Sequence, residues 1–474
     1  MRRLTHSYDA VVIGAGPNGL SAAIVLAQKG KSVVVYEAQA EVGGAVRSAQ
    51  LTLPGFIHDV CSSVYPLAIG SPFFRELPLA QHGLEWVQPP AALAHPLDDG
   101  TVVTLERSVE ETAAQLGADA KAYKKLIAPL VRGWDALADD FLRPPRLPRH
   151  PWGSARFGFR GIQPARRLAE SWFQGARARG LFAGLAAHAM LPLEYWGTAA
   201  FGLILAVSGH AVGWPVAGGG AQKVSNALAD HFLNLGGEII WNRRVSSLDE
   251  LPSSRVVLCD VTPRQLVEIA GDRLSLSFRK KLDRYRYGMG AFKMDWALSA
   301  PVPWKASGCG RAATVHLGGT LEEIAHSEAS AWRGDHVGKP FVLLVQPSLF
   351  DSSRAPEGKH TLWGYCHVPH GSMFNMADRI ERQIERFAPG FKDVVLGRSI
   401  LLPSALEQRN ANLIGGDING GAPTLGQLFL RPTARMYGTS LKGLYICSAS
   451  TPPGGGVHGM CGFFAARKAL KENF

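Results

Sequence analysis

Hydrophobic positions near the start of the chain predict a strand, a helix and a second strand in close succession. Residues 11–13 form a short apolar run, apolar residues recur at helical spacing over 20–27, and Gly30 follows as a helix end. A second apolar run occupies residues 33–35. This order predicts a βαβ unit, in which two parallel strands belong to one sheet.

The turn between the first strand and the helix has the spacing Gly14-x-Gly16-x-x-Gly19. The first glycine permits a tight turn, the second lets the backbone approach a pyrophosphate, and the third lets helix and strand pack closely. The helix N-terminus offers unpaired N–H groups to the same pyrophosphate. Glu37 ends the second strand, where its carboxylate can accept hydrogen bonds from ribose hydroxyls. The unit is therefore predicted to bind a dinucleotide rather than to be a glycine turn without a ligand.

A second glycine pair, Gly43 and Gly44, follows this unit and is succeeded by Arg47. This continuation is similar to that of flavoproteins with two dinucleotide-binding domains, in which FAD lies extended and the pair lies close to it. A simple doubly wound NAD dehydrogenase has no need of such a pair. FAD is therefore the predicted cofactor.

The C-terminal end of the chain carries a second glycine cluster. Residues 443–447 predict a short strand, residues 454–456 are three glycines, and a helix is expected to begin near Val457. The glycines let the backbone pass close to a planar ligand, and the helix N-terminus would face the pyrimidine side of a flavin. The predicted contacts in this turn are Gly455, Gly456, Val457, His458 and Met460.

Both ends, and much of the sequence between them, resemble the phytoene desaturase-like flavoproteins, especially their phytoene dehydrogenase-related branch. These belong to the structural class of the amine oxidases and GDP-dissociation inhibitors. Three further stretches carry the resemblance: residues 55–62, 415–421 and 450–459. The resemblance implies bound FAD and a backbone contact between Val245 and the adenine. The chain departs from typical carotene desaturases at Ser448, Ser450 and His458, where those proteins carry two glycines and a proline.

The predicted fold class is α/β. A Rossmann-like FAD-binding domain, of the two-dinucleotide-binding-domain flavoprotein type, is interleaved with an α+β substrate domain. A helix over 223–235 and a strand over 238–241 that continues through 243–248 return the chain to the FAD-binding sheet. The predicted ranges are 1–70, 215–275 and 405–474 for the FAD-binding domain, and 71–214 and 276–404 for the substrate domain.

Composition fits a globular protein with a large interior. The chain has 474 residues, of which 46% are hydrophobic and 19% charged. Its six cysteines form no C-x-x-C pair, so we expect neither a metal site nor a redox dithiol. Residues 1–7 do not read as a secretory signal, so a cytoplasmic location is expected. The apolar stretch 181–207 is interrupted by polar residues and predicts two buried helices along a hydrophobic pocket rather than a membrane span.

Positive charge is concentrated in one segment of this chain, whose formal net charge is +11. Residues 143–180 hold nine arginines, interleaved aromatic residues and a single acid, Glu170. Such a segment is typical of peripheral contact with an anionic membrane, although a solvated face of the substrate domain explains it equally well. Nucleic acid is a weaker alternative and is not expected as a partner. The oligomeric state is not predicted.

Two residues are candidates for catalysis. His458 lies within the flavin-side turn and could act as a base or acid, or could simply support the start of the helix. Lys293 lies on a predicted strand, at a spacing similar to that of the amine oxidases, whose lysine holds a water at flavin N5. Asp295 follows on the same strand face, so a plain salt bridge is equally expected. His58 and Asp59 are expected near the front of the flavin.

The predicted function is FAD-dependent dehydrogenation of an apolar, polyene- or isoprenoid-like substrate by hydride transfer to flavin N5. No second nucleotide-binding unit is evident, so electrons are expected to pass to oxygen or a quinone rather than to arrive from NAD(P)H. Two alternatives keep the fold. One is a polyene isomerase that uses reduced FAD, and the other is a non-redox protein that binds lipidated partners.

Overall fold

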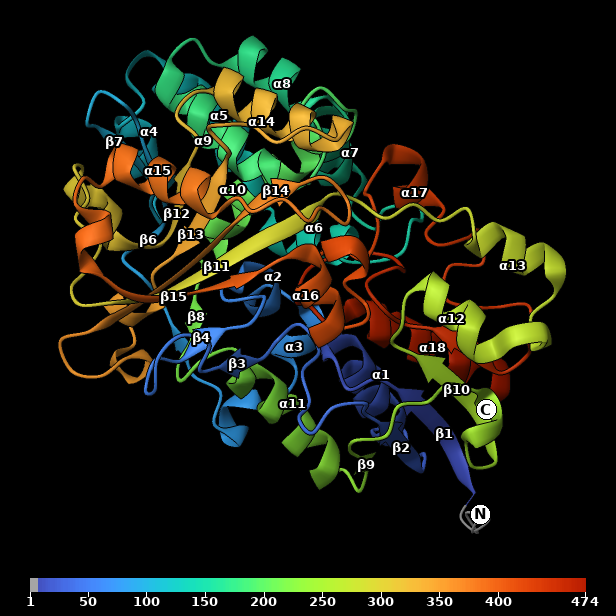
Figure 1. The fold of residues 1–474 in the computed structure, drawn as a ribbon. Helices are drawn as coiled ribbons and strands as arrows, with labels where there is room; N and C mark the ends of the chain where they lie inside the picture. The colour runs from blue at the N-terminus through green and yellow to red at the C-terminus, as the bar shows by residue number, and fades with distance from the viewer. Residues whose placement is uncertain (1–6) are drawn as a thin grey trace.

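The computed structural model describes residues 7–474, which form two sheets with helices packed around them (Figure 1). Residues 1–6, which belong to the first predicted range, lie outside the described residues. Among the described residues, no helix is both long enough and apolar enough to cross a bilayer.

The first sheet is parallel and has five strands. Their side chains alternate between two apolar layers, because successive residues of a strand point to opposite faces. Val12 and Val35 pack on one face, and Val11 and Val34 pack on the other. In sheet order, the strands are β16 (Leu444–Ile446), β10 (Ser254–Cys259), β1 (Tyr8–Ile13), β2 (Val33–Tyr36) and β9 (Glu238–Ile240).

Helices cover both faces of this sheet, and they include the predicted helix of the βαβ unit. One face packs against α1 (Pro17–Ala27), α11 (Gln222–Asn234) and α18 (Met460–Asn473). The other packs against α12 (Pro263–Ala270) and α13 (Leu276–Leu282). The predicted Rossmann-like α/β arrangement is therefore confirmed.

The second sheet has seven strands and is mostly antiparallel. All nine residues of the long strand that carries Lys293, next to one edge strand, are buried. In sheet order, the strands are β15 (Val395–Leu401), β11 (Gly290–Leu298), β14 (His360–Val368), β13 (Val342–Val345), β12 (Ala312–Leu317), β6 (Ala91–Pro96) and β7 (Val102–Leu105).

A helical layer packs on the second sheet and includes both helices predicted from the apolar stretch 181–207. They are α9 (Ala176–Ala187) and α10 (Thr198–Ala211), and most of their residues are buried. The same cluster includes α4 (Val109–Ala114), α5 (Ala120–Arg132), α6 (Trp134–Phe141), α8 (Ala165–Trp172) and α14 (Leu321–Arg333). On the other face lies α15 (Ala377–Phe387).

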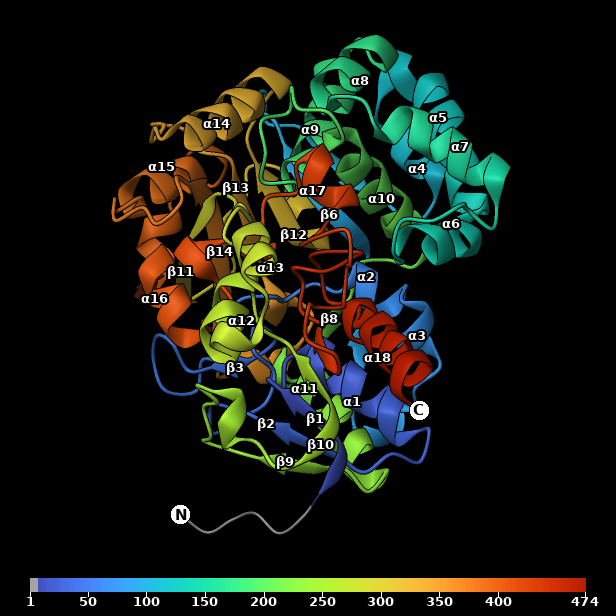
Figure 2. The ribbon, with the colours of Figure 1, turned by 90° about the vertical axis from the view of Figure 1, so that its right-hand side faces the viewer.

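The chain passes repeatedly between the two sheets (Figure 2). Every strand of the first sheet falls within the ranges predicted for the FAD-binding domain, and every strand of the second falls within those predicted for the substrate domain. Two short ribbons lie between them. They pair β3 (Ser48–Ala49) with β4 (His58–Asp59) and β5 (Trp86–Val87) with β8 (Val216–Ala217).

Two local predictions are wrong. Residues 243–248 form no strand, because the edge strand β9 already ends at Ile240. The C-terminal helix begins at Met460 rather than near Val457, because Gly459 takes a left-handed conformation, with φ of 69°. Residues 453–459 therefore form a loop.

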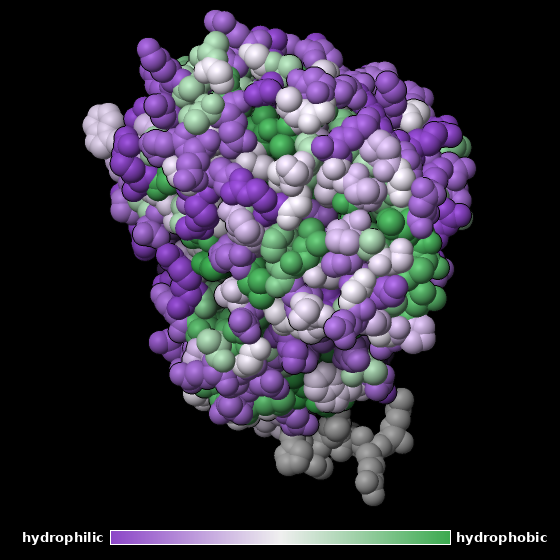
Figure 3. Space-filling model, turned by 90° about the vertical axis from the view of Figure 1, so that its left-hand side faces the viewer, coloured by the Kyte–Doolittle hydropathy of each residue, from purple (hydrophilic) through white to green (hydrophobic). Residues whose placement is uncertain are grey.

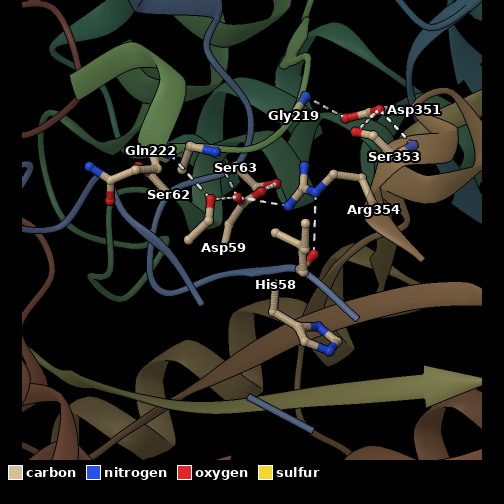
Figure 4. A network of polar contacts seen from close by, with 12 residues as sticks. His58, Asp59, Ser62, Ser63, Gly219, Gln222, Asp351, Ser353 and Arg354 are labelled. Atoms are coloured by element: carbon tan, nitrogen blue, oxygen red, sulfur yellow. Dashed lines mark hydrogen bonds and ion pairs between the residues drawn. The ribbon is translucent and has the colours of Figure 1, made fainter. Parts of the chain in front are cut away.

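A buried ion pair joins segments from both parts of the molecule (Figure 4). Nη2 of Arg354 lies 2.8 Å from Oδ1 of Asp59, and neither side chain is accessible to solvent beyond 1%. The same carboxylate accepts the backbone N–H of Ala221, and Asp351 nearby accepts that of Gly219. Burial raises the pKa of Asp59, but the charge of Arg354 outweighs it and holds that pKa below its usual value. The pair thus fixes residues 219–221 against the loop that carries Arg354.

Candidate functional site

The predicted dinucleotide turn lies in a groove at the carboxyl ends of β1, β2 and β10, where ligands of open α/β sheets bind. The first part of the groove is a cavity of about 110 Å³. Six predicted contacts line it: Gly14, Gly16, Glu37, Gly44, Arg47 and Val245.

The glycines shape this part of the groove in the predicted way. Gly14 has a φ of 96°, and a Cβ added at Gly19 would collide with the carbonyl oxygen of Gly14. A Cβ at Gly16 would lie 2.7 Å from Oδ2 of Asp260, in the space left for a ligand. Gly43 does not line the cavity; its left-handed backbone donates a hydrogen bond to Ala15.

Glu37 is buried and faces the groove, as expected for a residue that binds ribose. Its two carboxylate oxygens already accept the N–H groups of Ala15 and Gln39, at 2.8 and 2.9 Å. These bonds fix the carboxylate, and each oxygen keeps a second lone pair for a ligand hydroxyl. Arg47 donates to the carbonyl of Arg409, and burial lowers its pKa.

Asp260 is a groove residue that the sequence analysis missed. It follows β10 directly, and its Oδ2 accepts the N–H of Gly19 at 2.9 Å. Burial raises the pKa of Asp260 to about 7, and the nearby charge of Glu37 adds to the rise. The available signal was its place after the apolar strand 254–259, since the carboxyl ends of parallel strands gather at one edge.

The groove continues into a second cavity of about 280 Å³. Gly16, Gly44, Asp260, Asn410 and Asn412 line both parts, so the two form one extended groove. The far end is lined by Cys61, which follows β4, and by residues of the second sheet and of the C-terminal turn: Leu343, Trp363, Tyr365, Gly456 and Val457.

A third cavity, of about 240 Å³, adjoins this far end and is lined mainly by apolar side chains. The helix α10 supplies Phe201 and Ile204, so the pocket predicted along the stretch 181–207 is confirmed. Five residues line both this apolar cavity and the groove: Val64, His188, Asn419, Gly456 and Val457. The groove and the apolar cavity therefore meet at a junction defined by these five residues.

His458 lines the apolar cavity rather than the groove and is almost fully buried. Its Nδ1 accepts the N–H of Met460, which begins α18. Burial lowers the pKa of His458 to about 4, although the neighbouring backbone at Gly454 and Gly455 raises it in part. Gly455 also lines the apolar cavity, whereas Met460 lines a separate surface cleft.

Lys293 lies outside the groove and the apolar cavity. Its ammonium forms the salt bridge with Asp295 that the sequence allowed, with Nζ 2.6 Å from Oδ1. It also lies 5.3 Å from the ring centroid of Trp363, which does line the groove. His58 and Asp59 are buried and line none of these cavities. Residues 7–474 contain no cluster of three or more metal-type ligands.

Known proteins are similar to this chain in sequence and in fold. A sequence model described as an NAD(P)-binding Rossmann-like domain matches residues 12–77. A rat protein named pyridine nucleotide-disulfide oxidoreductase domain-containing protein 2 is 27% identical, over 99% of this chain and 94% of its own. The phytoene desaturase (neurosporene-forming) of Rhodobacter capsulatus is 26% identical over 52% of this chain and 51% of its own.

A solved structure of putrescine oxidase bound to putrescine has a TM-score of 0.65 at 16% identity, covering 98% of this chain and 99% of that one. The fold is therefore shared with amine oxidases, and the sequence relatives include oxidoreductases and a desaturase. The chain therefore resembles the phytoene desaturase-like oxidoreductases in sequence, and it shares its fold with the amine oxidases.

Proposed function

We propose that the protein binds FAD along the groove and dehydrogenates an apolar, polyene- or isoprenoid-like substrate held in the adjoining cavity. The observation that carries this proposal is the junction, where a dinucleotide groove opens directly into an apolar cavity. A ligand in that cavity would meet the end of the groove without crossing solvent.

The groove fits FAD better than a shorter ligand. The glycine turn and Glu37 suit the adenosine and pyrophosphate, and the groove extends beyond them past Gly44 to Tyr365 and Val457. When bound there, FAD would supply flavin N5 as a hydride acceptor at the junction. The protein's own residues would position the dinucleotide and exclude water.

The substrate proposal rests on the lining of the apolar cavity and on the similarity to a phytoene desaturase. Dehydrogenation removes one hydride and one proton from two neighbouring carbons. The hydride's electrons would pass through the flavin to oxygen or a quinone, and the proton would pass to a base or to water. An apolar lining suits a substrate that offers few hydrogen-bonding groups.

His458 is proposed to contribute to this chemistry as a donor rather than as a base. Its Nδ1 already accepts a hydrogen bond, so the neutral ring carries its proton on Nε2. Lys293 is proposed to promote the reaction with oxygen by its positive charge next to Trp363. A Lys293→Met variant should then be reoxidised more slowly by air while its flavin is reduced at the normal rate.

Peripheral contact with an anionic membrane is proposed for the face around the apolar cavity. Trp152 and Phe159 of α7 (Pro151–Gly161) are 88% and 77% exposed, and Phe429 ends α17 (Leu425–Phe429). The helix α10 packs against α7, and α10 and α17 both line the cavity. Figure 3 shows one side of the molecule, on which hydrophilic residues predominate around a smaller group of hydrophobic ones.

Electrostatic attraction to such a membrane would be weaker than the sequence suggests. Arg143, Arg149 and Arg166 are paired with carboxylates, three of which come from outside the basic segment: Asp139, Asp140 and Glu194. Six arginines have no carboxylate partner among the described residues: Arg146, Arg156, Arg160, Arg167, Arg177 and Arg179. Binding to vesicles with 30% anionic lipid should fall on replacing Trp152 and Phe159 by serine. Equal binding of the variant would refute this contact.

The main test follows the flavin band of the purified protein under anaerobic conditions while polyene and isoprenoid substrates are added in vesicles. Bleaching would support hydride transfer, and readmitted air would test oxygen as the acceptor. If the protein isomerises a polyene only when its flavin is reduced, and without net oxidation, the isomerase function would be favoured. If the protein takes up no FAD, the remaining function would be the binding of lipidated partners.

A matched pair of glycine variants tests the groove itself. Gly16→Ala should lose FAD, because its Cβ enters the groove next to Asp260. Gly153→Ala places a methyl group in open space on an exposed helix and should keep FAD. Equal FAD content in the two variants would contradict the assignment of the groove.

A further inference from the structure

His188 lies at the junction of the groove and the apolar cavity and lines both of them. It is the C-terminal cap of α9, and it is the one titratable side chain among the five junction residues. Its ring is half-buried although it lies in the interior, so its accessible part faces the cavities. Its edge-to-face contact with Trp214, at 5.9 Å between centroids, fixes the plane of the ring.

A second histidine determines which nitrogen of His188 carries the proton. Nε2 of His188 lies 3.1 Å from Nε2 of His316, a fully buried residue on β12. One of these two nitrogens must donate to the other. Burial lowers the pKa of His188 to about 3 and also lowers that of His316, so both rings are neutral at pH 7.

The remaining nitrogen of His316 decides the direction of that hydrogen bond. Nδ1 of His316 is buried and has no partner. A buried N–H without a partner is rarer and costlier than an unpaired acceptor, so Nδ1 of His316 carries no proton and its Nε2 is the donor. Nε2 of His188 therefore accepts, and the neutral His188 ring must carry its proton on Nδ1.

Nδ1 of His188 is free to bind a ligand. It makes no hydrogen bond with any described residue and, unlike Nδ1 of His316, it is not sealed from the cavities. Asn419, the other polar side chain at the junction, has an amide Nδ2 that is buried and lacks a partner, so it does not face the cavities. At the junction, the accessible side-chain donor is therefore Nδ1 of His188, and no carboxylate lies beside it.

We propose that the Nδ1–H group of His188 binds one acceptor oxygen, a carbonyl or hydroxyl, of an otherwise hydrocarbon substrate. This inference rests on the proposed function and narrows its substrate class. A pure hydrocarbon would leave the donor facing apolar carbon, which weakens binding, whereas an oxygen placed at the junction would satisfy it. The oxygen would fix which carbons of a long chain lie beside the end of the groove.

The test measures equilibrium binding of a matched ligand pair to the purified holoprotein. The pair is tritium-labelled all-trans-retinal and the hydrocarbon in which a methyl group replaces its aldehyde. Wild-type protein should bind the aldehyde about tenfold more tightly, the size expected for one hydrogen bond in a dry site. His188→Leu should remove this preference and leave binding of the hydrocarbon within about twofold.

Two controls keep the inference falsifiable. Ile204→Val, which trims the apolar lining, should weaken both ligands equally and keep the preference. Nitrogen-15 NMR of labelled histidines in the wild-type protein shows directly which ring nitrogen of His188 carries the proton. The His188 signals are assigned by their loss in His188→Gln, so this measurement does not depend on the folding of His188→Leu. A proton on Nε2 of His188, no preference in wild-type protein, or an equal preference in His188→Leu would each overturn the inference.

Flavin content is measured in the same samples. Loss of FAD with an unchanged aldehyde preference would count against the proposed FAD function and leave the role of His188 standing. Retained FAD without the aldehyde preference would count against the role of His188 and leave the proposed FAD function standing. The failure of one proposal is therefore distinguishable from that of the other.

Discussion

Replacing Asp260 with asparagine should abolish the pH dependence of FAD binding. The carboxyl group of Asp260 lines both parts of the groove, next to the turn that would hold the pyrophosphate. Burial raises its pKa from near 3.8 to about 7. Below pH 7 the neutral acid would tolerate a pyrophosphate, and above pH 7 the carboxylate would repel it.

The size of the effect follows from the charges involved. A rise of about three pKa units corresponds to roughly 4 kcal/mol against the ionised form. A pyrophosphate charge about 5 Å from the carboxylate costs about 3 kcal/mol more at an effective dielectric constant near 20. The dissociation constant for FAD should thus increase above pH 7, by up to tenfold per pH unit and about 100-fold in total.

The assay is titration of the FAD-free protein by flavin fluorescence between pH 6 and 9. Calorimetry in buffers of different ionisation enthalpy would count the protons, and close to one should be taken up per FAD at pH 8. Cys61 and His188, which also line the groove, ionise outside this range, since the pKa of Cys61 is raised to about 11 and that of His188 is lowered to about 3. The Asp260→Asn variant should bind FAD independently of pH, and at pH 9 more tightly than wild type.

Stability of the FAD-free protein gives a second measure of the same group. Because the folded-state pKa is raised, the stabilising contribution of the neutral acid is complete below about pH 4 and is lost as the pH rises to about 7. The melting temperature should fall over that window in wild type and less in the asparagine variant. Wild-type binding that is constant from pH 6 to 9, or a variant that keeps the wild-type slope, would refute the reasoning.

Three further perturbations test packing. Arg354→Met leaves a carboxylate unpaired in a fully buried site and should lower the free energy of unfolding by about 3–5 kcal/mol, measured by calorimetry. Arg273→Met, at an exposed ion pair, should lower it by less than about 0.5 kcal/mol. Equal losses in the two variants would contradict the burial argument. Ile204→Trp should fill the apolar cavity and lower kcat/KM at least about tenfold with FAD content unchanged, and normal kinetics would place the substrate elsewhere. Gly462→Ala should prevent stable folding, because its Cβ would collide with the carbonyl oxygen of Asn18 where α18 crosses α1; a variant of normal melting temperature would show that these helices can separate.

The dinucleotide turn could be predicted because everything it needs lies within one short segment. The apolar runs, the glycine spacing and Glu37 span 11–37 and depend on local backbone geometry and strand alternation. The two buried helices over 176–211 were predictable for the same reason, since their apolar lengths are evident without knowing their neighbours.

Some local predictions failed because a neighbouring contact decided them. The C-terminal helix starts at Met460, since Gly459 is left-handed and His458 accepts the first N–H of the helix. The basic segment 143–180 seemed almost free of acids, but acids from outside it, including Asp139 and Glu194, approach three of its arginines only in the folded chain.

The sequence by itself determined the dinucleotide-binding unit, the similarity to phytoene desaturase-like flavoproteins and the α/β class, because these are recorded in short-range spacing. Only the tertiary structure determined what surrounds the reacting space. Asp260 lies 241 residues from the glycine whose N–H it accepts, and His188 lies 128 residues from the histidine that sets its tautomer. Protonation states and cavities depend on which distant groups share one buried volume, and no local pattern records that arrangement.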